Sequence, residues 1–492
     1  MSINYLILIC ILCLINTQDI KPSNSTKSDN QTETKEEKEI QPTTSQEQKE
    51  IEKVEEEKKE EEIIEEAPPK ILTIPLPYEN NEDFLITALG IGTPRTYFPV
   101  QVDTTTSATW IPSLKCGTCK SFLKYNSSAS STASENRNDT FILYDEDGNV
   151  KGEVTNDDIQ FDKYIIKNFS FIQATELSEG YRDYEDGKLG LGYHHSNGKE
   201  MNFLEMLKEN DLIEESVFSI KELNESYGEI TIGKEPFTEE PFPYCNISST
   251  EDLDDIFKES WVCELTHLSI NLVRDNESLT DNLIIDNAFD LDESLISFDT
   301  ASSYIIAPYE FISLFENEFF NKYYSNVCRK INIQKDIAFI CNKDKFNNET
   351  IKNITNALII SFVIDGNSFN IDINKLFEPF DKENVEFFIH FRQYNNLIWN
   401  IGHPFVHHYT LVFDAENARV GLIGEYTDVS EKLEKLKKSY FKNTWQIVLF
   451  IIAVSLLVII LFLIIFGIYR CVRRKVADKN EKISLVNHEN KP

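Results

Sequence analysis

The sequence predicts an all-β fold built as two lobes, with a single transmembrane helix near the C-terminus. Three observations predict this architecture. Short runs rich in Val, Ile, Phe, Tyr and Thr recur between turn signals over residues 70–427, which is typical of an all-β domain. This stretch is long enough for two lobes of roughly 180 residues each. An Asp-Thr-x-(Ser/Thr)-Ser motif occurs once in each half of it, and an uncharged apolar run follows towards the end of the chain.

The chain begins with an apolar segment. Residues 3–15 (INYLILICILCLI) have about the length of a signal-peptide core and are too short to cross a bilayer. No Lys or Arg precedes them, so the positive charge of the n-region is that of the α-amino group alone. An N-terminal anchor is the alternative interpretation. We expect residues 1–18 to be a signal peptide that directs the following region into the secretory lumen.

An acidic tract follows over residues 19–69. It consists of Ser, Thr, Gln, Asn, Lys and above all Glu, with too few apolar side chains to offset the entropy of ordering, so we expect it to be disordered. It could serve as a propeptide, although a solvated spacer is the simpler interpretation. The whole chain carries a formal charge of −34. This charge argues against nucleic acid as a partner, because a phosphate backbone requires a basic face.

The β-rich stretch divides into an expected N-terminal lobe, residues 70–235, and an expected C-terminal lobe, residues 236–427. Two segments within it are the better candidates for helices, residues 203–211 and 309–321. The expected strands include ILTIPL (71–76), FLITALGI (84–91), YFPVQV (97–102), FILY (141–144), GEITIG (228–233), SFVIDG (361–366), YTLVFD (409–414) and RVGLIG (419–424).

The apolar run over residues 447–468 contains 22 residues without a charge, enough to span the hydrocarbon core as a helix. Arg470 and further basic residues up to Lys475 follow it directly, which places this side in the cytoplasm. We therefore expect a single-pass type I membrane protein, with a stalk over 428–446 and a cytoplasmic tail over 469–492. The ectodomain would lie in the lumen of a secretory or endolysosomal compartment or at the cell surface.

The cysteines fit this placement. Six lie in the expected luminal region, and an even number in an oxidising compartment predicts three disulfides, although six cysteines allow 15 pairings. The C-x-x-C motif at 116–119 could also be redox-active or bind zinc, but zinc requires further ligands at similar spacing. Acceptor motifs for N-glycans recur in the same region and agree with secretion. The cysteines are Cys116, Cys119, Cys245, Cys263, Cys328 and Cys341, and the acceptors include Asn126, Asn168, Asn224, Asn276 and Asn353.

A short motif occurs in both halves of the β-rich stretch, as VDTTTSATWIPS (102–113) and as FDTASSYIIAP (298–308). Each copy has an apolar residue, Asp-Thr, a Ser, further apolar residues and a Pro. One Asp-Thr-x-Ser is weak evidence, because turns use such residues widely. Two copies, each after an apolar strand, indicate two related loops that present Asp103 and Asp299.

In these motifs the chain resembles the pepsin-like aspartic proteases over nearly all of residues 70–427. That family usually carries Asp-Thr-Gly-Ser-Ser, followed by Trp-x-Pro-Ser, in its first catalytic loop and Asp-Thr-Gly-Thr-Ser in its second. DGKLGLG (186–192) and WNIGHPFVHHYTLVFDAENARVGL (399–422) resemble the segments that pack beneath the two aspartates. The matching loop residues are Asp103, Thr104, Ser107, Trp110, Pro112, Ser113, Asp299, Thr300, Ser302 and Ser303.

The resemblance implies that Asp103 and Asp299 are catalytic carboxylates that hydrolyse peptide bonds in peptide or protein substrates. Two neighbouring carboxylates cannot both ionise easily, so one stays protonated. The ionised group would take a proton from a water that attacks the peptide carbonyl, and the protonated group would stabilise the oxyanion and supply the leaving amine. This mechanism requires no metal and no cofactor.

The resemblance also implies roles for neighbouring side chains. The hydroxyls of Thr104 and Thr300 would lock the two loops together. Tyr144, 41 residues after Asp103, would be the flap tyrosine that closes over the substrate, steered by Trp110. The expected supporting residues are thus Thr104, Thr300, Ser107, Ser302, Trp110 and Tyr144.

Further expectations concern disulfides and metals. The pairs Cys116–Cys119 and Cys328–Cys341 stand where the family often has disulfides, which leaves Cys245 and Cys263 for each other. His407 and His408 are adjacent and are expected to face opposite sides of a strand, so we expect no metal site there.

Four positions depart from the family pattern. Thr105 and Ala301 replace the glycines after the two Asp-Thr pairs, Asp145 replaces the flap glycine, and His403 replaces an aspartate in the last segment. A β-branched residue at 105 restricts the backbone and adds bulk beside the expected water. The preferred prediction is that the protein is an aspartic endopeptidase. The alternatives are a catalytically impaired pepsin-like protein that binds peptides without cleaving them, and a receptor or scaffold.

Overall fold

The computed structural model describes most of residues 71–433 and part of the C-terminal apolar run. The described residues are 71–77, 85–134, 140–145, 148–179, 181, 187–193, 202–224, 226–236, 238–272, 289–290, 294–393, 397–433, 452, 455–456, 459–466, 468–470 and 473. The expected signal peptide and acidic tract, residues 1–69, lie outside them, as do residues 434–451 and 474–492.

The described part of the chain is mostly β-strand, and its sheets are consistent with a bilobal pepsin-like fold. All eight expected strands are present, because alternating or continuous apolar side chains cover one or both faces of a sheet. They are β1 (Leu72–Pro77), β2 (Ile86–Ile91), β3 (Thr96–Asp103), β5 (Thr140–Asp145), β10 (Tyr227–Ile232), β18 (Leu358–Ile364), β23 (Thr410–Asp414) and β24 (Arg419–Ile423).

The N-terminal half forms a seven-stranded sheet in the order β2-β3-β8-β4-β7-β6-β5. Most of its pairs are antiparallel, but β3 runs parallel to β8 and β4 runs parallel to β7. The strands not yet defined are β4 (Trp110–Pro112), β6 (Gly148–Phe161), β7 (Tyr164–Leu177) and β8 (Lys188–Gly190).

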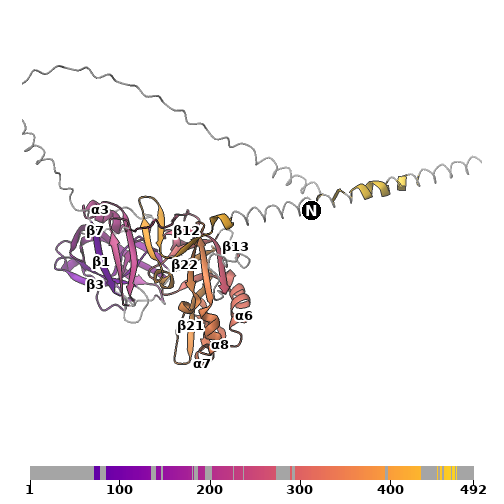
Figure 1. Cartoon of the computed structure of the whole chain (residues 1–492). Coiled ribbons are helices and arrows are strands. Elements are labelled where there is room, and N and C mark those ends of the chain that lie inside the picture. The colour runs from indigo at the N-terminus through magenta and orange to yellow at the C-terminus, as the bar shows by residue number, and fades with distance from the viewer. Residues whose placement is uncertain are drawn as a thin grey trace, which may run out of the picture. The chain divides into compact units, whose positions relative to one another are not determined.

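The C-terminal half forms a 12-stranded sheet in the order β16-β17-β21-β15-β22-β14-β12-β18-β19-β25, with β13 on β12 and β20 on β21. Figure 1 shows β1, β3 and β7 on one side of the molecule and β12, β21 and β22 on the other. The new strands are β12 (Val262–Leu272), β13 (Phe289–Asp290), β14 (Leu295–Phe298), β15 (Ile305–Pro308), β16 (Cys328–Ile333), β17 (Asp336–Asn342), β19 (Asn367–Asp372), β20 (Phe377–Pro379), β21 (Asn384–Arg392), β22 (Ile398–Ile401) and β25 (Tyr426–Asp428).

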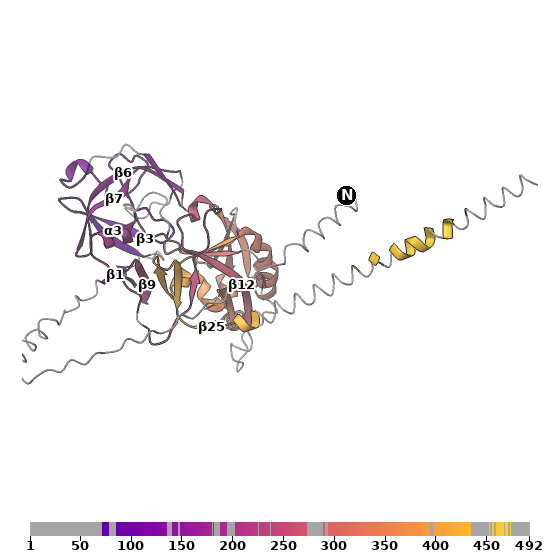
Figure 2. The ribbon, with the colours of Figure 1, turned by 90° about the horizontal axis from the view of Figure 1, so that it is seen from above.

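A six-stranded sheet joins segments that are distant in sequence, in the order β1-β10-β9-β23-β24-β11. Its remaining strands are β9 (Val217–Asn224) and β11 (Tyr244–Asn246). Figure 2 shows β9 beside the gold strands from the C-terminal end, and β9 pairs directly with β23. The rings of Phe218 and Phe413 stack at 4.6 Å across this pair, and Trp261 packs against both. One apolar core therefore contains residues of all three sheets.

Short helices lie between the strands. Both expected helical segments are confirmed, the first as α3 (Phe203–Glu209) and the second as a mixed helical stretch over residues 309–323. α3 begins where the side chain of Asn202 accepts a hydrogen bond from Glu205 N, and it buries one apolar face. The others used below are η3 (Asp255–Phe257), α7 (Lys343–Phe346), α8 (Glu349–Asn356) and α9 (His403–Val406).

Three disulfides are present: Cys116–Cys119, Cys245–Cys263 and Cys328–Cys341. The expectation of three disulfides is confirmed, and the pairs are those expected. Four of the glycan acceptor asparagines, Asn126, Asn168, Asn224 and Asn353, are exposed, and Asn276 lies outside the described residues.

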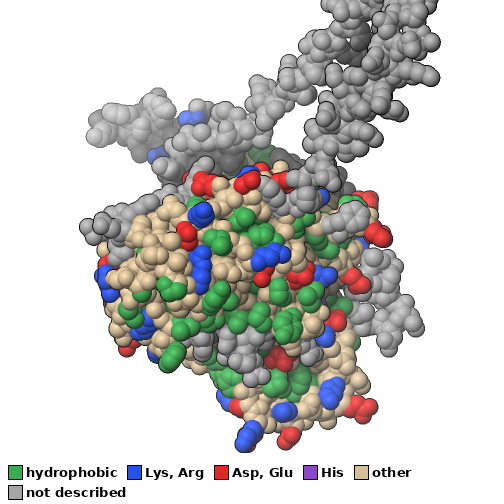
Figure 3. All heavy atoms as spheres, turned by 90° about the vertical axis from the view of Figure 1, so that its left-hand side faces the viewer, with side chains coloured by type: hydrophobic (Ala, Val, Ile, Leu, Met, Phe, Trp, Pro, Cys, Tyr) green, Lys and Arg blue, Asp and Glu red, His purple; other side chains and the backbone are tan. Residues whose placement is uncertain are grey.

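On the face seen in Figure 3, charges of both signs are interspersed with apolar side chains. Within the expected span, the described residues between 452 and 468 are helical. Among all described residues, no helix meets the length and apolarity that crossing a membrane requires.

Candidate active site

Two strand ends place the aspartates. β3 ends at Asp103, and β14 ends one residue before Asp299. Each of these strands runs parallel to a short strand, β8 in the first case and β22 in the second. Asp103 is 0% exposed and Asp299 is 3% exposed. Buried carboxylates need fixed donors, because burial without partners is costly.

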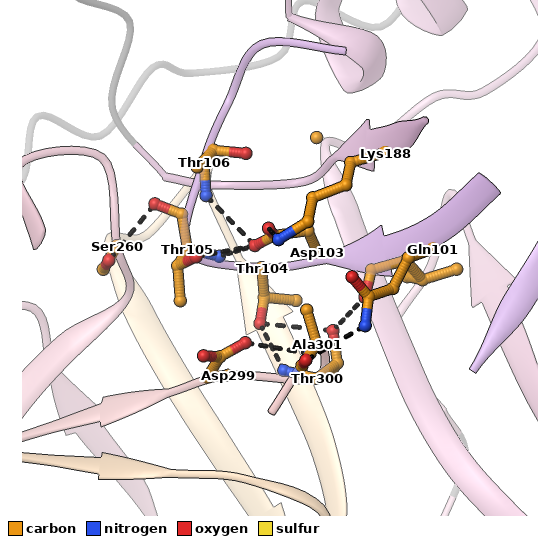
Figure 4. A network of polar contacts seen from close by, with 12 residues as sticks. Gln101, Asp103, Thr104, Thr105, Thr106, Lys188, Ser260, Asp299, Thr300 and Ala301 are labelled. Atoms are coloured by element: carbon orange, nitrogen blue, oxygen red, sulfur yellow. Dashed lines mark hydrogen bonds and ion pairs between the residues drawn. The ribbon is translucent and has the colours of Figure 1, made fainter. Parts of the chain in front are cut away.

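Two threonines join the aspartate loops (Figure 4). Thr104 Oγ1 donates to Phe298 O at 2.7 Å, and Thr300 Oγ1 donates to Val102 O at 2.7 Å. Thr300 N also donates to Thr104 Oγ1 at 3.2 Å. The two loops are therefore held by reciprocal hydrogen bonds, which is the arrangement that the family resemblance implies.

The Asp103 carboxylate has several polar contacts. Its Oδ1 accepts hydrogen bonds from Thr105 N at 2.7 Å, Thr105 Oγ1 at 2.6 Å and Thr106 N at 3.3 Å. Its Oδ2 lies 3.2 Å from Lys188 Nζ. The residue that replaces glycine at 105 thus contributes a hydroxyl to the carboxylate, in addition to bulk.

Lys188 is a site residue that the sequence analysis missed. It lies on β8 and is 3% exposed, and its Nζ points at Asp103 in Figure 4. Burying an ammonium group is costly unless a carboxylate compensates it. The available signal was a charged residue inside DGKLGLG, between apolar and glycine positions of a segment expected to pack beneath the aspartate.

Two uncharged groups donate hydrogen bonds to Asp299. Its Oδ1 accepts from Ala301 N at 2.8 Å, and its Oδ2 accepts from Asn400 Nδ2 at 2.7 Å. Asn400 is fully buried on β22, and the sequence analysis did not single it out. The two aspartates therefore differ in environment: one faces a buried cation, the other a neutral amide.

The two expected supporting serines do not bind the aspartates. Ser107 N and Oγ donate to Glu259 Oε2 at 2.8 and 2.7 Å. Ser302 Oγ donates to Tyr304 O within its own turn. Glu259 precedes β12 and was also missed by the sequence analysis, so a third buried carboxylate supports the first loop.

The expected flap is a hairpin of β5 and β6. Tyr144 pairs with Asn149 near its end and is 42% exposed, and β5 lies beside η3 of the C-terminal half. Trp110 is buried and packs edge-on against Tyr181 at 5.8 Å. No described contact joins Trp110 to Tyr144.

The expectation that His407 and His408 lie on a strand is wrong. They follow α9 in a helical turn, where His407 N donates to His403 O at 2.9 Å, and β23 begins only at Thr410. Pro404 in the first turn favours this helix. The argument against a metal site, which relied on the alternation of a strand, therefore does not hold.

The chain was compared with models of protein families and with known proteins. The model of the eukaryotic aspartyl protease family matches residues 85–424. Vacuolar protease A of Arthroderma otae is 36% identical over 138 residues, covering 27% of this chain and 34% of that protein. Procardosin-B of Cynara cardunculus is 34% identical over 137 residues, covering 27% of each chain. Vacuolar protease A of Aspergillus fumigatus is 28% identical over 264 residues, covering 51% of this chain and 61% of that protein. The chain thus spans less than two thirds of the length of each of these relatives.

Proposed function

Because this chain belongs to the eukaryotic aspartyl protease family, we propose that it is an aspartic endopeptidase that uses Asp103 and Asp299 on peptide or protein substrates. The observation that carries the proposal is the pair of buried aspartates at the ends of two corresponding strands, whose loops Thr104 and Thr300 join. Two carboxylates in one site share a proton and titrate as a unit.

The contacts support different roles for the two carboxylates. Asp103 faces Lys188 and accepts three hydrogen bonds, so it is the charged member and takes a proton from the attacking water. Asp299 accepts hydrogen bonds from Ala301 N and Asn400 Nδ2, and in this proposal it is the member that keeps the shared proton. It then donates a hydrogen bond to the developing oxyanion and passes the proton to the leaving amine.

The hairpin that carries Tyr144 is the proposed lid. Its position beside η3 supports closure over a peptide, and closure would exclude water during hydrolysis. Buried Trp110 lies in the core cluster that includes Leu143 of the same hairpin, so it supports the lid through packing.

A second candidate function is peptide binding without cleavage, and the Lys188–Asp103 ion pair favours it. A cation 3.2 Å from Oδ2 competes with the water that this oxygen has to activate. Thr105 adds a side chain where the family usually has glycine.

Cleavage of a peptide library by the full-length protein, purified in a mild detergent, separates the two functions. We expect turnover at acidic pH, with kcat/KM at least about a thousandfold lower in Asp103→Asn and in Asp299→Asn, because the pair acts as one unit. Peptide binding without turnover in the wild type would establish the second function. Turnover that survives both substitutions would refute the role of the pair.

We also propose the topology expected from the sequence: lobes over 70–235 and 236–427, a stalk over 428–446, a span over 447–468 and a cytoplasmic tail over 469–492, preceded by a signal peptide and an acidic tract. The disulfides, the exposed glycan acceptors and the helical residues within the apolar run support a luminal or extracellular ectodomain. In sealed vesicles, external protease should digest one side only. Recovery of an intact tail with a digested ectodomain, or the reverse, assigns the orientation, and cleavage on both sides contradicts a sealed single pass.

A further inference from the structure

The side chains of Glu222, His403 and His407, which are of types that can bind a metal ion, lie close together next to the loop of Asp299. Glu222 comes from β9, and His403 and His407 come from α9 and the turn that follows it. Glu222 Oε2 lies 2.5 Å from His407 Nδ1 and 3.8 Å from His403 Nε2. One ligand atom from each residue lies within 4.8 Å of the other two.

The backbone explains this convergence. α9 begins at His403, and residues four apart on a helical turn present their side chains on the same face. The bond from His407 N to His403 O shows that the turn continues to His407. α9 packs beside β9, where Glu222 continues the strand face of the buried residues Phe218 and Ile220.

The donor set suits a particular class of metal. Two imidazoles and one carboxylate, with a fourth position for water, form a common tetrahedral site for Zn²⁺. Zinc–nitrogen bonds of about 2.0 Å place the donor atoms of a tetrahedron about 3.3 Å apart. The two distances in the structure, 2.5 and 3.8 Å, lie on either side of this separation, so small side-chain rotations would suffice.

The ligands are also in a suitable state. The Glu222 side chain is only 6% exposed, and such a carboxylate benefits from a cationic partner. A metal ion can enter, because the His407 side chain is 38% exposed and lines an open pocket of about 510 Å³ together with Glu222.

We propose that Glu222, His403 and His407 form a binding site for a divalent transition metal, with Zn²⁺ as the preferred ion. The metal ties α9 to β9. It acts away from the carboxylate pair, but it steadies the second aspartate loop, since His403 N donates to Ser302 O at 2.8 Å. The site does not depend on whether the protein cleaves peptides.

Zinc binding is tested by isothermal titration calorimetry on full-length protein in detergent, freed of metal with a chelator, at pH 7.5. His407→Gln and Glu222→Gln change ligands on two different elements, and exposed His407 tolerates the change best. His408→Gln is the matched control, because this neighbouring imidazole bonds to Pro404 O and is outside the ligand set. Melting temperature with and without Zn²⁺ gives a second readout, since a ligand of the folded state stabilises it.

We expect one Zn²⁺ to bind at this site, with affinity at least about tenfold weaker in each ligand variant and unchanged in His408→Gln. Zn²⁺ should raise the melting temperature of the wild type and of the control by several degrees, but not that of Glu222→Gln. Absence of binding, or binding that persists unchanged in both ligand variants, overturns the proposal.

Discussion

Lys188 and Asn400 occupy equivalent positions in the two halves of the site. Each lies on a strand parallel to the aspartate strand, two residues before a glycine that packs against the aspartate loop. Each binds a carboxylate oxygen, Lys188 that of Asp103 and Asn400 that of Asp299. The repeated framework thus carries a charged residue at this position in one half and a neutral amide in the other, which supports the proposal that Asp299 holds the shared proton.

Lys188→Leu should move the pH–rate profile. Removing a cation 3.2 Å from Asp103 makes the anionic pair less favourable, so both limbs of the profile should shift upward by roughly 1 to 3 pH units. The measurement is kcat/KM against pH for a fluorogenic peptide. Lys115→Leu is the control, since Lys115 forms an ion pair with Glu153 at the surface, where its side chain is 59% exposed. An unshifted pH–rate profile in Lys188→Leu would show that the lysine does not influence the ionisation of the carboxylate pair.

Two substitutions of Thr105 distinguish the effect of its bulk on catalysis from the effect of its hydrogen bond to Asp103. Thr105→Val keeps the bulk but loses the 2.6 Å bond to Asp103, whereas Thr105→Gly loses both. If bulk limits water access, Thr105→Gly should raise kcat/KM by about tenfold while Thr105→Val lowers it. Equal losses in both variants would instead show that the hydroxyl matters and that the bulk does not.

Gly402→Ala should displace the backbone of the Asp299 loop and destabilise the fold. A Cβ at this position would lie 2.3 Å from the backbone oxygens of Ser302 and Tyr304, so the backbone has to move. We expect a loss of about 1 to 3 kcal/mol in the free energy of unfolding, measured with urea, and a lower kcat. Gly117→Ala, where the added Cβ meets nothing within 4 Å, should be close to neutral. Equal stability of the two variants would contradict the close approach.

The Asp414 carboxylate should make the free energy of unfolding depend on pH. Burial alone raises its pKa, but hydrogen bonds from Asn417 and Arg419 outweigh this and hold the pKa below its usual range. A folded-state pKa below the unfolded one contributes stability above the unfolded pKa, near 4, and this contribution is lost as pH falls further. Asp414→Asn should therefore cost about 1 to 3 kcal/mol at pH 7 and less at pH 3, measured by urea unfolding. If the difference in unfolding free energy between Asp414→Asn and the wild type does not change with pH, the lowered pKa of Asp414 is not its cause.

The strands with apolar alternation could be predicted from the sequence, but the long strand β6 could not. Asn156 and Asp157 disfavour a strand by propensity. In the fold, however, Asn156 Nδ2 donates to Ser170 Oγ, and Asp157 accepts from the Tyr125 hydroxyl, so both polar groups are satisfied inside the sheet. Tertiary contacts outweigh local preference here.

The aspartate pair could also be predicted, because its motif is repeated. Its polar partners could not, since apolar flanks in DGKLGLG and WNIG conceal that Lys188 and Asn400 point at the carboxylates. The cluster of Glu222, His403 and His407 was beyond sequence reasoning as well. Nothing local indicates that β9 and α9, about 180 residues apart, pack together.

The six-stranded sheet ties folding to the order of synthesis. β9 pairs with β23, and roughly 190 residues of chain lie between them, so at 5 to 20 residues per second a ribosome needs about 10 to 40 s to supply the partner. During this interval the edge of β9 stays open to other strands, which is a risk for aggregation. Pairing of β9 therefore waits for synthesis of the C-terminal end of the β-rich stretch, and a nascent chain stopped before residue 410 should remain bound to chaperones.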